Sequence, residues 1–200
     1  LTFSRRQPLQ WRSVNINSMV QGLKRMLSRS MGPAITLMIE TDPKVPAILT
    51  DPGTLQSSLM NLVLNARDAM PKGGTITLNT ATVEVFGEGA ASADLVPGRY
   101  VVITVTDSGI GMDATTLSRV TEPFFTTKRP GMGTGLGLSI VHGFATQSGG
   151  RLNIQSQPGL GTRVRLLLPA TRPELAPPQN TPSVIPVSYT HLTLPTSDLV

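Results

Sequence analysis

The chain has 200 residues with 39% apolar, 4% aromatic and 14% charged residues, and a formal net charge of +5. That length suits one domain with a buried core and short flanking segments, and 19 glycines with 17 prolines indicate many turns. The chain has no cysteine, which excludes disulfides, thiolate zinc sites and a cysteine nucleophile, and its two histidines are too few for a multi-histidine metal site.

The basic residues are concentrated at the start of the chain. Six of them and no acidic residue lie within the first 30 positions, and the other 170 residues carry a net charge of −1. A basic end could meet nucleic acid or a membrane surface, but a solvated helix face and linker account for it more simply. No apolar run approaches the ~20 residues that span a bilayer. Because the chain starts at Leu1 without Met, we expect a fragment of a longer protein.

Two helices around two short strands are expected in the first part of the chain. Apolar residues recur every three or four positions from Ile16 to Leu27, which predicts a helix capped by Asn15 or Asn17. A second helix is expected from Asp51-Pro52 to about Met70, because proline favours the first helical turn. The strands expected between these helices are 35–40 and 47–50.

Strands dominate the second part of the chain. Alternating β-branched residues predict strands at 75–85 and 100–106, joined by a surface loop. A third helix is expected at 137–147, followed by strands at 151–156 and 162–168. This order predicts an α/β (α+β) two-layer sandwich, in which a mixed β-sheet carries about three helices on one face.

The C-terminal end differs in character from the rest. Residues 170–186 are rich in proline and are expected to form an extended linker. The last segment, 187–200 (VSYTHLTLPTSDLV), is similar to a translated sequencing adapter. We therefore expect no function from it, and His191 takes no part in the chemistry considered below.

A polar row lies on the second expected helix. Asn61, Asn65 and Asp68 are spaced so that they share one helix face, with apolar residues opposite. Amide oxygens on this face could coordinate an Mg²⁺ ion that also holds phosphate oxygens. An ordinary solvent-facing row is the alternative.

An acidic residue followed by two glycines ends the strand at 100–106. The carboxylate of Asp107 could accept a hydrogen bond from the amino group of a purine, and Gly109 and Gly111 would let the backbone approach the ring. A tight turn in which Asp107 bonds its own loop is the alternative.

Four alternating glycines, from Gly131 to Gly137, lead into the third expected helix. Their N–H groups and the helix N-terminus could bind phosphate, and Lys128 and Arg129 just before them could pair with the β- or γ-phosphate. Neither the Walker A pattern nor G-x-G-x-x-G fits this segment. A flexible linker is the alternative.

Taken together, the order and spacing of these motifs resemble the sensor histidine kinase catalytic domain (HATPase_c, the GHKL or Bergerat ATP-binding fold). The resemblance covers about 14–169, while 1–13 is similar to the end of the preceding dimerisation helix and its linker. The segments that match the N, G1, F and G2 boxes are Asn61–Asp68, Asp107–Gly111, Glu122–Phe125 and Gly131–Gly137.

The resemblance implies ATP and Mg²⁺ as ligands and a role for each matching residue. Asn65 would ligate Mg²⁺ with Asn61 beside the phosphates, and Asp107 would bind the adenine amino group. Thr162 would contact adenine, often through water. The other ATP-binding residues implied are Asp68, Gly109, Gly111, Lys128, Gly133, Thr134, Gly135, Leu136 and Gly137. The catalytic residues implied are Asn61, Asn65, Lys128 and Arg129.

Two positions depart from many relatives. Asp68 stands where many family members have lysine, so this helix offers less positive charge, for which Arg67 could compensate. Asn61 stands where ATPases of the same fold, such as gyrase B and MutL, have a glutamate as general base. A neutral amide is a poor base, so efficient ATP hydrolysis is not expected. The γ-phosphate would instead pass to a histidine on a separate dimerisation domain.

The resemblance also implies partners and leaves alternatives open. It implies a phosphoacceptor domain in the same protein, a homodimer of the full-length kinase, a response regulator receiver domain and a cytoplasmic location, without nucleic acid. His142 is expected to pack or lie on a helix surface, and Phe124 and Phe125 to support the hinge of the glycine segment or fill the core. The alternatives are a protein-serine kinase of the anti-sigma type, a nucleic-acid-binding module and a non-catalytic nucleotide-binding module.

Overall fold

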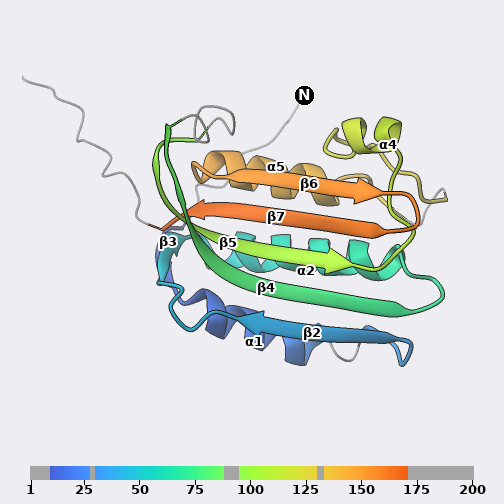
Figure 1. Cartoon of the computed structure of the whole chain (residues 1–200), viewed down its shortest axis with the longest axis horizontal. Coiled ribbons are helices and arrows are strands. Elements are labelled where there is room, and N and C mark those ends of the chain that lie inside the picture. The colour runs from blue at the N-terminus through green and yellow to red at the C-terminus, as the bar shows by residue number, and fades with distance from the viewer. Residues whose placement is uncertain (1–9, 28–29, 88–94, 130–132, 171–200) are drawn as a thin grey trace, which may run out of the picture.

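A five-stranded mixed sheet forms the front layer of the computed structural model, which describes residues 10–27, 30–87, 95–129 and 133–170 (Figure 1). The strand order is β2-β4-β5-β7-β6, with β2 parallel to β4 and every other pair antiparallel. The strands are β2 (Ile35–Thr41), β4 (Gly74–Val85), β5 (Gly98–Asp107), β6 (Arg151–Gln157) and β7 (Gly161–Pro169). The predicted mixed sheet is confirmed.

Among the described residues, three helices cover one face of this sheet, which gives the predicted two-layer α/β sandwich (Figure 1). They are α1 (Ile16–Leu27), α2 (Pro52–Asp68) and α5 (Gly137–Gln147). The core lies between the layers, where apolar helix residues such as Leu59 and Phe144 meet sheet residues such as Ile76, Ile103 and Leu166. Burial of these side chains is the main source of stability in such a sandwich.

The helix ends follow the expected chemistry in two of three cases. Of the two caps expected for α1, Asn15 is the one used, because its Oδ1 accepts a hydrogen bond from Ser18 N at 2.9 Å. Asp51 caps α2 by accepting from Thr54 N at 2.8 Å, with proline in the first turn. Helix α5 has Leu136 at its N-cap and no side-chain cap bond, so its first N–H groups are left to other partners.

The structure adds two elements that the sequence did not predict. Strand β1 (Arg12–Val14) pairs with β3 (Ile48–Thr50) in a separate antiparallel sheet. Three residues are too few to display an alternating pattern. Helix α4 (Ala114–Arg119), capped by Asp113, has no buried residue and therefore no apolar periodicity to detect.

Several expectations fall outside the described residues, namely the dimerisation-helix end at 1–9, Gly131, most of the linker at 170–186 and the tail at 187–200. The domain boundaries therefore stay predictions. Among the helices that the structure does describe, none combines the length and apolar character needed to cross a membrane.

Candidate functional site

Asp107 is a buried carboxylate at the last position of β5. Asp107 is only 7% exposed, and its Oδ1 accepts hydrogen bonds from Gly109 N at 2.8 Å and Thr162 N at 3.2 Å. Burial raises the pKa of the Asp107 carboxyl, against the opposing effect of these two bonds. The strand register sets Asp107 opposite Thr162, and Thr162 opposite Ser156.

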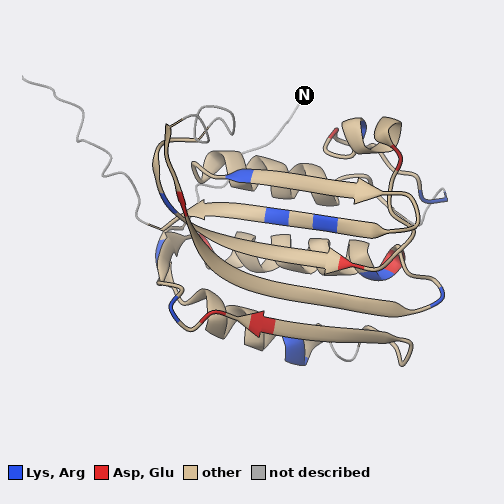
Figure 2. Ribbon diagram, in the orientation of Figure 1, with Lys and Arg blue, Asp and Glu red and all other residues tan. Residues whose placement is uncertain are grey.

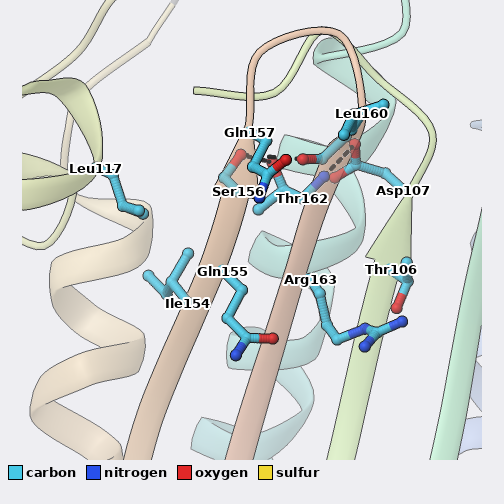
Figure 3. Close-up of a pocket in the computed structure, with 11 residues that line it drawn as sticks. Thr106, Asp107, Leu117, Ile154, Gln155, Ser156, Gln157, Leu160, Thr162 and Arg163 are labelled. Carbon is cyan, nitrogen blue, oxygen red and sulfur yellow. Dashed lines mark hydrogen bonds between the residues drawn. The ribbon is translucent and has the colours of Figure 1, made fainter. Parts of the chain in front are cut away.

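An open pocket of about 640 Å³ lies beside these residues (Figure 3). Asp107, Thr162 and Ser156 converge at one end of it, while Leu117 and Ile154 supply apolar walls. The Ser156 and Thr162 hydroxyls lie 2.9 Å apart, and Ser156 Oγ also accepts from Met112 N at 2.9 Å. A carboxylate with hydroxyls against apolar walls suits a flat ring that carries a hydrogen-bond donor.

The two glycines after Asp107 are required by the packing of the protein itself. A Cβ on Gly109 would lie 2.6 Å from the Ala69 carbonyl oxygen, and a Cβ on Gly111, whose φ is +67°, would overlap the Gln157 carbonyl. Ile110 N donates to Ala69 O at 3.0 Å, so this loop is fastened to the end of α2. A direct role for either glycine in ligand binding stays a prediction.

The polar row of α2 meets the start of α5 and a lysine from the segment before it. A Cβ on Gly137 would lie 3.5 Å from Asn65 Nδ2 and 3.8 Å from Asn61 Cβ, so both amides border the start of α5. Lys128 Nζ donates to Asp68 Oδ2 at 2.6 Å and to Asn65 Oδ1 at 3.4 Å. Five of the residues predicted from sequence are thus brought together.

Two cations converge on Asp68. Arg67 donates to its Oδ1 from two nitrogens, at 2.7 and 2.9 Å, while Lys128 holds its Oδ2. Partial burial alone would raise the pKa of the Asp68 carboxyl, but the Lys128 and Arg67 contacts outweigh it and lower that pKa. Arg67 is engaged with Asp68 and with the Ser30 carbonyl. The positive charge beside Asn65 therefore comes from Lys128, whereas Arg129 is exposed.

The described part of the glycine segment turns sharply into α5. Gly135 has φ +66° and lies against the backbone of Phe124, where no Cβ would fit. Thr134 Oγ1 accepts a hydrogen bond from Leu136 N at 3.4 Å, and a Cβ on Gly133 would lie 3.1 Å from Lys128 Cδ.

The two phenylalanines before the glycine segment do not fill the core. Phe124 is 74% exposed and has φ +66°, an uncommon conformation for a residue with a side chain. Phe125 lies under the Arg119 guanidinium, 4.5 Å from its ring centroid. The core alternative is wrong for Phe124, whose backbone instead supports the turn at Gly135.

The pocket and the amide cluster adjoin each other at the end of α2. Asp68 is the last residue of that helix, and the next residue, Ala69, receives the loop that follows Asp107. Figure 2 shows acidic and basic residues gathered where α2 and β5 end. Sequence reasoning missed Ser156, although its alternation with Leu152 and Ile154 places a polar residue on the helix-facing side of β6.

Comparisons with known proteins agree with this arrangement. Residues 50–172 match the model of the HATPase_c family, described as "Histidine kinase-, DNA gyrase B-, and HSP90-like ATPase". The chain is 40% identical over 170 residues to the sensor kinase CckA of Brucella abortus, covering 84% of this chain and 18% of that protein. It is 35% identical over 162 residues to the sensor histidine kinase ZraS of Escherichia coli K12, covering 80% of this chain and 31% of that protein.

Solved structures show the same fold. The catalytic domain of the histidine kinase ThkA, in a nucleotide-free form, matches with a TM-score of 0.66 at 24% identity, over 82% of this chain and 97% of that one. Full-length ShkA in complex with AMPPNP matches with a TM-score of 0.64 at 24% identity, over 82% of this chain and 32% of that one.

The chain belongs to the HATPase_c family. Within that family it is a catalytic domain of the sensor histidine kinase type, as its sequence resemblance predicted. It spans less than a third of the length of the two curated relatives named above.

Proposed function

We propose that this domain binds Mg·ATP and passes the γ-phosphate to a histidine on a separate dimerisation domain. The observation that carries the proposal is the adjacency of two sites at the end of α2. A buried carboxylate pocket lies on one side, and an amide cluster with a lysine lies on the other. Adenine and triphosphate need these two kinds of site a short distance apart.

The adenine end of the nucleotide would occupy the Asp107 pocket. The adenine amino group would donate to the Asp107 carboxylate, and Thr162 would contact the ring directly or through water. Because Asp107 Oδ1 is already fixed by two backbone N–H groups, the carboxylate is held in one orientation before the nucleotide arrives. Such preorganisation lowers the entropic cost of binding.

The residues around Asn65 fit a bound divalent cation. Asn65 Oδ1 and Asp68 Oδ2 both accept hydrogen bonds from the Lys128 ammonium, so hard oxygen atoms here already face a positive charge. Asn65 would hold Mg²⁺, which would neutralise phosphate charge. The phosphates would meet Lys128, Arg129, the segment Gly133–Gly137 and the uncapped N-terminus of α5.

Transfer of the phosphoryl group requires little chemistry from this domain. Asn61 borders the start of α5 as a neutral amide, which cannot act as a general base for water. Phosphoryl transfer depends mainly on positioning and charge neutralisation. The domain would therefore hold the γ-phosphate until an external nucleophile arrives.

The proposal extends to the partners of the parent protein. These are a phosphoacceptor histidine domain of the same chain, a second copy in a homodimer, and the receiver domain of a response regulator. The names of the relatives, which are sensor kinases, support this set of partners. A cytoplasmic location follows from the use of ATP as phosphate donor.

The first test is titration of the full chain with a fluorescent ATP analogue in the presence of Mg²⁺. Asp107→Asn should weaken binding about 10- to 100-fold, because a hydrogen bond to a charged group contributes about 1.5–3 kcal/mol. Glu84→Gln serves as a matched control, since Glu84 forms an exposed ion pair with Arg99 at the opposite end of β4 and β5. Equal affinity of Asp107→Asn and the native chain would refute the adenine site.

A further inference from the structure

The Lys128 ammonium lies between the two oxygen atoms best suited to a cation. It is 2.6 Å from Asp68 Oδ2 and 3.4 Å from Asn65 Oδ1. In the proposed function Asn65 is the Mg²⁺ ligand, so an intramolecular cation already contacts the oxygen that the metal would need. The segment that carries Lys128 also leads into the glycines expected over the triphosphate.

The ion pair between Lys128 and Asp68 is partly exposed to solvent, so breaking it costs little free energy. The side chains of Lys128 and Asp68 are 33% and 30% exposed, and ion pairs that reach solvent contribute little to stability. Arg67 holds the other oxygen of Asp68, so the carboxylate stays in place when Lys128 departs. The pair can therefore open without loss of the carboxylate's position.

Four charged groups must share this space once nucleotide is bound: the Lys128 ammonium, the Asp68 carboxylate, the divalent cation and the triphosphate. An ammonium and a divalent cation on the same Asn65 oxygen repel each other, and a bare triphosphate repels the Asp68 carboxylate. Both conflicts disappear if Lys128 moves from Asn65 to a phosphate while the divalent cation takes its place beside Asp68.

We propose that Asp68 and Lys128 form an ion-pair switch that makes nucleotide binding by this domain depend on Mg²⁺. In the free protein Lys128 occupies the cation position. On binding, Lys128 transfers to phosphate and Asp68 faces the divalent cation, so Asp68 acts as a positioning residue that disfavours metal-free nucleotide. This inference rests on the proposed function and assigns a role to the Asp68 carboxylate.

The test measures the dissociation constant of a fluorescent ATP analogue for the full chain, with millimolar Mg²⁺ and with EDTA. The ratio of the EDTA value to the Mg²⁺ value is the coupling between metal and nucleotide. Asp68→Asn should strengthen binding in EDTA and lower this ratio about tenfold, because the repulsion between carboxylate and phosphate is lost. Lys128→Gln should weaken binding in EDTA, because a cationic partner of the phosphate is removed. It should raise the ratio, because no ammonium then competes with Mg²⁺ for Asn65.

The switch predicts that the ratio falls in Asp68→Asn and rises in Lys128→Gln. Loss of a merely structural ion pair would change the ratio in the same direction in both variants. Asp68→Glu keeps the charge and should retain the native ratio, and Glu84→Gln, in the exposed pair with Arg99, is the matched control. Thermal unfolding of each variant reports its folding, and Lys128→Gln changes only a partly exposed side chain.

An unchanged ratio in Asp68→Asn, or equal weakening under both conditions, overturns the switch while the proposed function stands. If the native chain binds no ATP analogue under either condition, both the proposed function and the switch are wrong. The two failures are therefore distinguishable.

Discussion

At the scale of single residues, the candidate site contains a carboxylate that is costly to bury. Asp107 is 7% exposed, and its burial raises the pKa of its carboxyl although two backbone N–H groups favour the charged form. A folded protein that holds such a group ionised gives up stability for its position. This cost is expected at a site whose carboxylate must face a ligand.

The pH dependence of stability should reveal this cost. The folded pKa of Asp107 is raised, so between the unfolded and folded values the native state binds more protons than the unfolded state. The free energy of unfolding therefore falls as pH rises through that window, and the loss persists at neutral pH. We expect Asp107→Asn to have an equal or higher Tm than the native chain at pH 7, and to lose this advantage in acid. A lower Tm of the variant at every pH would contradict the prediction.

A second prediction at this scale compares two glycines. Gly109→Ala should destabilise the fold by about 1–3 kcal/mol, because the new methyl would meet the Ala69 carbonyl oxygen at 2.6 Å and Asp107 Oδ1 at 2.8 Å. Gly143→Ala, on the exposed face of α5 with nothing within 4 Å, should stabilise by up to about 1 kcal/mol. Urea unfolding of both variants measures these changes. Destabilisation of similar size in both variants would show that the packing argument is wrong.

At the scale of elements, helix α2 organises both halves of the site. Its buried face, with Leu59 and Val63, joins the core, while Asn61, Asn65 and Asp68 line the other side. Its C-terminal end receives the loop after Asp107 through the bond from Ile110 N to Ala69 O. A single helix therefore fixes the distance between the Asp107 pocket and the cluster around Asn65.

The segment before α5 contributes Lys128 to the candidate site. Lys128 reaches α2 through contacts with partly exposed side chains, and α5 begins without a side-chain cap. An uncapped helix start leaves N–H groups for an anion. In the free protein, Lys128 and the start of α5, which would hold phosphate in the bound state, thus have a partly exposed ion pair and no side-chain cap, respectively.

At the scale of the whole molecule, we expect the chain to bind nucleotide without phosphorylating itself, because His142 is expected to pack or lie on a helix surface. His142 is exposed on α5, and the curated relatives are three or more times longer than the part matched here. Incubation of the full chain with γ-³²P-labelled ATP should therefore give no stable label on the protein and little free phosphate. Label that survives denaturation but disappears in His142→Gln would contradict this prediction.

The order of the three long helices and of the five strands of the main sheet could be predicted from the sequence, and the residues of the candidate site were proposed from it. Local patterns sufficed, because helix periodicity, strand alternation and turn residues act over a few positions, as in α2 and α5. The polar row of α2 and the acidic strand end of β5 were visible for the same reason. Elements without a local pattern, the three-residue β1 and the exposed α4, escaped detection.

Which of these groups touch depends on the packing of the fold. Asp107 meets Thr162 through the antiparallel register of β5 and β7, and Lys128 meets Asp68 across 60 positions of sequence. Such pairings depend on how the layers pack, which no window of neighbouring residues encodes. From the sequence, Asp68 indicated only that this helix carries less positive charge. The fold shows that Lys128, from a distant segment, supplies a positive charge beside it.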